Sequence, residues 1–152
     1  MIFKGTNGQT VELRITNYQF PNKNEGDWDG NWLHIYLKVD SKCGKWQTID
    51  PSLTTWEVQE LINWFNNLSD NRDVQYREML FTEPNLSFEL HNLPSDKEKK
   101  ISIKFNLESR PKSASEDKEY FVDILAANDE LKRIADELKD ELERYPERKP
   151  IE

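Results

Sequence analysis

Alternation of apolar and polar residues with period two is the feature that most constrains the fold of this chain. Such alternation places apolar side chains on one face of a strand and polar side chains on the other. Five stretches show it, at residues 11–15, 33–39, 86–90, 101–107 and 120–124. One buried face and one solvated face is typical of antiparallel sheets. The alternation therefore predicts a mainly antiparallel sheet.

Two other segments have helical spacing of their apolar residues. The first covers residues 54–68, where Thr54 and Glu57 have the spacing of a capping box. The second covers about 128–145, with Asn128 as the expected N-cap and Pro146 as the helix stop. We find no internal repeat. Strands combined with one helix in the middle and one at the C-terminus predict a single α+β domain over residues 1–152.

The charge balance and the single cysteine exclude several classes of protein. The chain has 21 Lys and Arg against 29 Asp and Glu, a formal net charge of −8, which disfavours direct binding to nucleic acid or anionic membranes. One cysteine, Cys43, cannot form an internal disulfide. No stretch approaches the ~18 apolar residues of a membrane helix, and the start lacks the apolar core of a signal peptide. We expect a cytoplasmic protein.

Catalytic patterns are weak in this sequence. Ser87, Glu89 and His91 share one face of an expected strand and could resemble an acyl-transfer set. Same-face neighbours on a strand are ~7 Å apart, so Ser87 and His91 are ~13 Å apart, too far for a nucleophile and its base. We therefore expect no catalytic residues.

Metal and cofactor patterns are equally weak. Residues 25–30 imitate the start of a calcium loop, but its twelfth position is Tyr36, where a glutamate is required. The five glycines are scattered and form no phosphate-binding loop. We expect no metal site and no cofactor.

Two features point instead to recognition of another protein. Five tryptophans are present, and we expect most of them in the core, except Trp28, which lies between Asp27 and Asp29 in a predicted loop. The second feature is the expected outer face of the last helix, an anionic surface suited to a basic partner. Its candidate contact residues are Asp136, Glu137, Asp140 and Glu141. A solvated helix face without a partner is the alternative.

Three segments resemble the WapI-like family of bacterial immunity proteins. They are residues 27–33 (DWDGNWL), 50–58 (DPSLTTWEV) and 83–90 (EPNLSFEL), in the order that the family has. None of the three is a catalytic signature. The resemblance covers about residues 27–90 and extends weakly into the strands that follow.

This resemblance implies an immunity protein that binds the C-terminal toxin domain of a large polymorphic toxin, typically a nuclease that attacks RNA. It implies inhibition by stoichiometric binding, without catalysis. The acidic composition is compatible with a basic toxin domain as the partner. A general protein-interaction or regulatory domain without a toxin partner is the alternative, and an enzyme is the third. The oligomeric state is left open.

Overall fold

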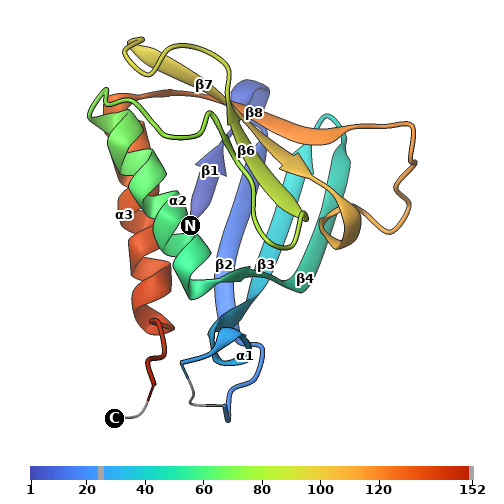
Figure 1. Cartoon of the computed structure of the whole chain (residues 1–152). Helices are drawn as coiled ribbons and strands as arrows, with labels where there is room; N and C mark the ends of the chain where they lie inside the picture. Colours follow the sequence, from blue (N-terminus) through green and yellow to red (C-terminus); the bar gives the residue numbers. More distant parts are fainter. Residues whose placement is uncertain (24–25, 151–152) are drawn as a thin grey trace.

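The alternating segments lie in strands of two antiparallel sheets in the computed structural model, which describes residues 1–23 and 26–150 (Figure 1). The first sheet has the order β1-β2-β3-β4, so each strand pairs with its neighbour in the sequence. The second sheet has the order β5-β6-β7-β8. The α+β class and the antiparallel pairing predicted from the sequence are confirmed.

Each sheet is followed directly by a long helix. The strands of the first sheet are β1 (Ile2–Lys4), β2 (Thr10–Tyr18), β3 (Trp32–Ser41) and β4 (Gly44–Thr54), and α2 (Thr55–Ser69) follows. The strands of the second are β5 (Glu78–Met79), β6 (Leu86–Leu90), β7 (Glu98–Phe105) and β8 (Tyr120–Ala127), and α3 (Asn128–Arg144) follows. Short helical turns are η1 (Thr6–Gly8), α1 (Trp28–Asn31) and η2 (Leu107–Ser109). The connectivity thus repeats, although the sequence shows no repeat.

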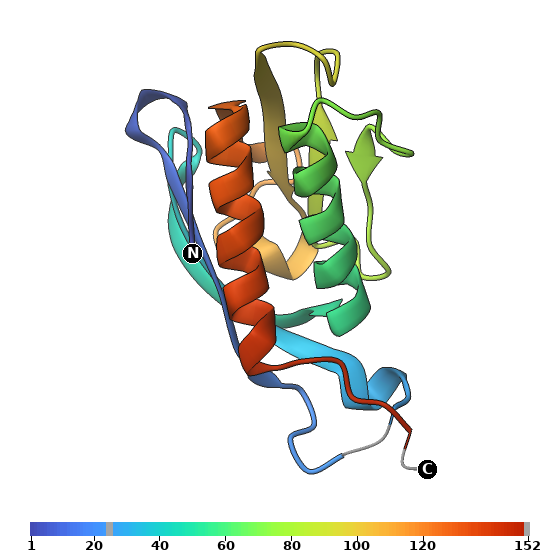
Figure 2. The same cartoon turned by 90° about the vertical axis from the view of Figure 1, so that its left-hand side faces the viewer.

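The two long helices lie side by side and share one core with both sheets (Figures 1 and 2). Three phenylalanines from different elements meet in this core: Phe3 of β1, Phe65 of α2 and Phe88 of β6. Their ring centroids are 5.7 to 6.1 Å apart, within the range of favourable aromatic pairs. The core therefore joins the first sheet, the helices and the second sheet into one packed unit.

The two helix starts differ in how well their caps were predicted. At α2 the Thr54 side chain accepts from the Glu57 amide at 3.2 Å, and Glu57 accepts from the Thr54 amide at 3.1 Å, so the capping box is confirmed. At α3 the predicted N-cap is wrong, because Ala127 holds that position and Asn128 is the first helical residue. The Asn128 side chain instead accepts a hydrogen bond from buried Lys99, whose pKa is lowered by burial.

Two features of the strands differ from the sequence prediction. Alternation over 101–107 placed Leu107 on the buried face, but β7 ends at Phe105, and Leu107 opens η2 with a φ of 50° and is 58% exposed. Strand β4 was not predicted, because Pro51 and Asp50 interrupt any alternation there. The structure accommodates them at an irregularity in the β3–β4 register.

Among the helices in residues 1–23 and 26–150, none combines the length and apolar character that a membrane span requires.

Candidate functional site

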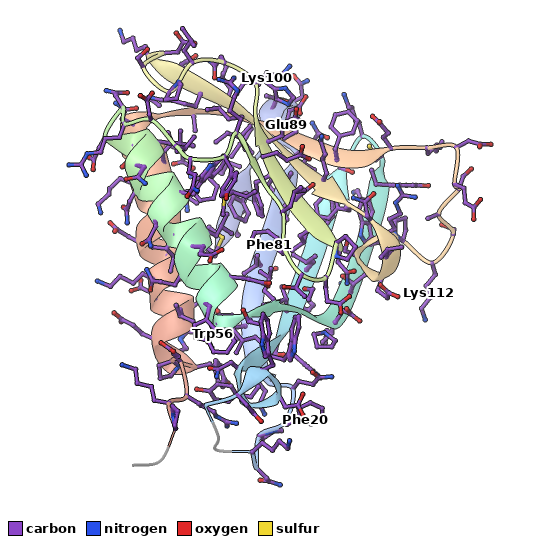
Figure 3. All side chains as sticks on the ribbon, viewed as in Figure 1. Phe20, Trp56, Phe81, Glu89, Lys100 and Lys112 are labelled. Carbon is purple, nitrogen blue, oxygen red and sulfur yellow. The ribbon has the colours of Figure 1, made fainter. Side chains whose placement is uncertain are left out.

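Three tryptophans from three elements form an aromatic surface at one end of the molecule, which we call the tryptophan cluster. Trp28 begins α1, Trp32 begins β3 and Trp56 lies in the first turn of α2. The ring centroids of Trp28 and Trp56 are 5.2 Å apart, and those of Trp28 and Trp32 are 6.1 Å apart. Trp28 is 54% exposed. Figure 3 shows Trp56 at the same end of the molecule as Phe20, another exposed aromatic residue.

The expectation that most tryptophans lie in the core is only partly correct. Trp46 and Trp64 are buried, whereas Trp32 and Trp56 keep part of their surface exposed beside Trp28. Their exposure has a local cause. Trp32 is on the outward face of β3, because Leu33 and Ile35 take the inward positions, and Trp56 lies off the apolar face of α2. Large aromatic surface is therefore left in contact with solvent.

A buried asparagine holds the elements under the cluster together. Asn31, the last residue of α1, is fully buried, and its oxygen accepts from the Thr55 hydroxyl at 2.8 Å. The same oxygen accepts from the Arg148 amide at 2.9 Å. The side-chain NH2 group of Asn31 donates to the backbone carbonyls of Asp27 and Arg148 at 2.9 and 3.1 Å. Asn31 thereby ties α1 to the start of α2 and to the C-terminal tail.

The C-terminal tail after α3 runs to α1 and also bonds to residues 20–23 (Figures 1 and 2). The Arg148 guanidinium donates to the carbonyls of Phe20 and Pro21 at 2.9 and 2.8 Å, and also to that of Lys23. It also lies 3.5 Å from the centre of the Tyr18 ring, a cation–π contact.

Trp56 is fixed by the same tail, since its indole N–H donates to the Glu147 carboxylate at 2.7 Å. Together with the bonds of Asn31, this contact links the tail to both α2 and α1. The Trp56 side chain and the backbone of α1 are thus positioned by contacts between residues far apart in the sequence.

Asp27 and Asp29, the two predicted contact residues beside Trp28, are exposed and also serve the local structure. The Asp27 carboxylate caps α1 by accepting from the Gly30 amide at 2.8 Å. Asp29 forms an ion pair with Lys23 at 3.0 Å. Both residues flank Trp28 in the sequence and are exposed, so they remain candidate contact residues.

Two hollows that contain carboxylates adjoin the cluster. The first, which we call the β4 hollow, has a volume of about 290 Å³ and is lined by Gln19, Trp32, Asp50, Pro51, Glu83 and Glu108. The second, the α3 hollow, has a volume of about 410 Å³, and Trp56, Glu60, Glu143 and Glu147 are in its lining. Burial and the nearby Glu108 carboxylate raise the pKa of Asp50 above its usual range. The β4 hollow is therefore acidic throughout its charged lining, whereas the α3 hollow also contains Lys139.

The acidic residues predicted on the outer face of α3 do not all lie there. Asp136 and Asp140 are exposed, and Glu137 is half-buried. Glu141 is buried, accepts from the Ile15 amide at 3.1 Å and lies 3.5 Å from the N-terminal ammonium group. Its assignment to the outer face was wrong, because α3 turns this position toward β2.

Much of the remaining charge on α3 is paired along the helix. Lys132 lies 3.2 Å from the Asp136 carboxylate, and Arg133 forms ion pairs with both Glu130 and Glu137. Such i,i+3 and i,i+4 pairs are ordinary features of a solvated helix face. The outer face of α3 therefore presents less uncompensated charge than its sequence indicates.

The outer face of the second sheet brings together a histidine, a serine and an aspartate. His91 Nε2 lies 2.6 Å from the Ser102 hydroxyl oxygen, and that hydroxyl donates to Asp123 at 2.5 Å. A catalytic triad places the histidine between the serine and the carboxylate, so that the imidazole can take the serine proton. Here the serine is in the middle. The carboxylate bonds the serine rather than the imidazole, so this order differs from that of a catalytic triad.

Metal ligands do not gather in the described part of the chain. Residues 1–23 and 26–150 contain no group of three or more His, Cys, Asp or Glu side chains placed to hold a metal ion. Glu25, the first position of the calcium-loop pattern, lies outside the described residues.

Cys43 lies in the β3–β4 hairpin turn, near the carbonyls of Glu119 and Phe121.

Comparison with protein families identifies a match over most of the chain. The model of the family described as "Immunity protein WapI-like family" matches residues 1–146 of this chain. The search of curated proteins and the search of solved structures each returned no significant match. The family match covers the tryptophan cluster, both sheets and all of α3.

Proposed function

Because the chain belongs to the WapI-like family of immunity proteins, we propose that it binds and neutralises the C-terminal domain of a polymorphic toxin. The family supports a toxin-immunity role. The finer statements are our proposal: the toxin domain is a nuclease that acts on RNA, the site of action is the cytoplasm, and inhibition is stoichiometric, without chemistry by this chain. The observation that carries the proposal is a partly exposed cluster of three contacting tryptophans within the matched region.

The geometry supports binding better than catalysis. Tryptophan is enriched among the residues that dominate protein–protein binding energies, and Trp28 leaves more than half of its surface uncovered. The hydrogen-bonded order His91–Ser102–Asp123 differs from that of a catalytic triad, because the carboxylate bonds the serine and not the histidine. A toxin that binds RNA needs a positively charged surface, so an acidic inhibitor with a net charge of −8 can approach it favourably.

Two surfaces are candidates for the contact with the toxin. One is the tryptophan cluster with Asp27 and Asp29, and the other is the outer face of α3 with Asp136 and Asp140. Buried Glu141 is no longer a candidate, since it bonds the β2 backbone.

Co-expression with the toxin domain encoded next to this gene tests the proposal. We expect that the toxin domain alone stops growth, that this protein restores growth, and that the two proteins co-elute from a sizing column. A control toxin domain from an unrelated locus should remain lethal, because immunity depends on a specific interface. Continued killing by the neighbouring toxin, with no complex on the column, would refute the proposed function.

A further inference from the structure

Several large apolar residues are exposed in the described part of the chain. Leu80, Leu93 and Leu125 are each more than half exposed, but scattered single residues of this kind are normal on soluble proteins. The rings of Trp28, Trp32 and Trp56 instead form one continuous aromatic contact. A contiguous exposed aromatic surface marks a place where another molecule binds.

The charges around the cluster define the chemistry of that molecule. The β4 hollow places Asp50, Glu83 and Glu108 beside Trp32, and its described lining contains no lysine or arginine. Burial and then the Glu108 carboxylate raise the pKa of Asp50, so these carboxylates repel one another. A cationic side chain in this hollow would relieve that repulsion. Arginine suits it especially, because a guanidinium can bond carboxylates and stack on an aromatic ring.

The protein itself uses this chemistry at the same end of the molecule. Arg148 places its guanidinium 3.5 Å from the centre of the Tyr18 ring while donating to backbone carbonyls. An arginine held over an aromatic face with its N–H groups bonded is therefore compatible with this local environment.

We propose that the tryptophan cluster and the adjoining β4 hollow form the docking surface for the toxin domain, and that they take a basic segment of it. Arginine or lysine side chains of that segment lie over the indole rings of Trp28 and Trp32, with their charged ends among Asp50, Glu83 and Glu108. This inference rests on the proposed function and specifies its interface. We place the centre of the contact away from the outer face of α3, because Lys132 and Arg133 already pair with Asp136 and Glu137 there.

The tryptophan cluster is also preorganised for binding. Asn31 and the C-terminal tail hold the cluster in place before the partner arrives, so few side chains need to be ordered in the complex. Rigid aromatic anchors lose little conformational entropy on binding.

Binding of the purified toxin domain to full-length variants tests this inference. Trp28→Ala should raise the Kd by about 30-fold or more, as expected for an interface hot spot. Leu125→Ala is the matched control, since Leu125 has the same exposed fraction of 54% but lies on β8. The control should change the Kd by less than about twofold.

A pair of charge-reversal variants separates the two candidate surfaces. Glu83→Lys combined with Glu108→Lys should slow association by about tenfold or more and weaken its dependence on salt. Asp136→Lys combined with Asp140→Lys makes the same change in net charge on α3 and should have a much smaller effect. The melting midpoint of each variant confirms that it is folded, and all four residues are exposed.

The outcomes separate the docking surface from the function. If the wild-type protein rescues growth and binds, but Trp28→Ala and the Glu83/Glu108 variant bind as it does, the docking proposal is refuted and immunity stands. A large loss in the α3 variant alone would assign the interface to α3 and also refute the proposal. If the wild-type protein neither rescues nor binds, the proposed function is refuted, and the docking proposal with it.

Discussion

Replacing Asn31 by alanine should lower the free energy of unfolding by about 3 kcal/mol. The substitution leaves the Thr55 hydroxyl, which is 1% exposed, without its acceptor, at a cost of about 1–3 kcal/mol. It also removes two hydrogen bonds to the Arg148 backbone and one to the Asp27 carbonyl. These groups are closer to solvent and can partly bond to water, so they add about 1 kcal/mol.

Guanidinium unfolding followed by far-UV circular dichroism measures this loss as a shift in midpoint at unchanged slope. For a chain of this size, 3 kcal/mol corresponds to a fall of about 6–12 °C in Tm. Asn63→Ala is the control, because the Asn63 side chain accepts from Gln59 on the exposed face of α2. The control should change stability by less than about 0.5 kcal/mol. A loss for Asn31→Ala no larger than that of the control would refute the role of Asn31 in joining α1, α2 and the C-terminal tail.

Two further predictions concern buried and paired carboxylates. Glu57→Ala should cost about 2 kcal/mol of unfolding free energy in the same assay, because the carboxylate accepts from two backbone amides, including that of Thr82 at 3.0 Å. A loss below about 0.5 kcal/mol would contradict this account. Hydrogen bonds from Arg133 hold the pKa of Glu130 below its ordinary value of 4.5. The stability that this ion pair contributes is therefore fully present above pH 4.5, and it is lost as the pH falls through the lower pKa of the folded state. Glu130→Gln should therefore lose less stability than the wild type on acidification below pH 4.5; equal losses would show that the pair is not responsible.

The elements with strong local signals were predictable from the sequence. The stretch 33–39 alternates strictly, and it forms the interior of β3 with its apolar residues buried. The capping box at Thr54 sets the start of α2 through bonds within four residues, so local reasoning was sufficient.

Elements that depend on tertiary pairing were not predictable in the same way. Strand β5 has two residues, and β1 has three, so neither can show a period. Strand β4 contains Pro51 and is held by its register with β3 rather than by a pattern of its own. The position of Glu141 was missed because its partner, the Ile15 amide, lies 126 residues away in the sequence.

The candidate site was predictable only in part. Trp28 was singled out by its flanking aspartates, and it is exposed. Its neighbours Trp32 and Trp56 carried weaker signals: an outward position on β3 and a place off the apolar stripe of α2. Their assembly depends on contacts between Asn31 and Arg148, which are 117 residues apart, and no local pattern encodes such a contact.

The family resemblance is confirmed, and the match extends from residue 1 to residue 146, well beyond the 27–90 region that carried the motifs. Two of those motifs have structural roles. The segment 27–33 contains the Asp27 cap and Asn31, and the segment 50–58 contains the α2 capping box. The same residues that shape the fold at this end therefore also place the tryptophans.

The most direct test of the central claim is a titration of the toxin domain's RNA-cleaving activity with this protein. Neutralisation by stoichiometric binding predicts that activity falls in proportion to the added protein and disappears near one equivalent, in parallel with formation of the complex. Complete loss at a small fraction of an equivalent would reveal turnover and contradict inhibition by binding alone. Undiminished cleavage at a large excess of protein would contradict immunity itself.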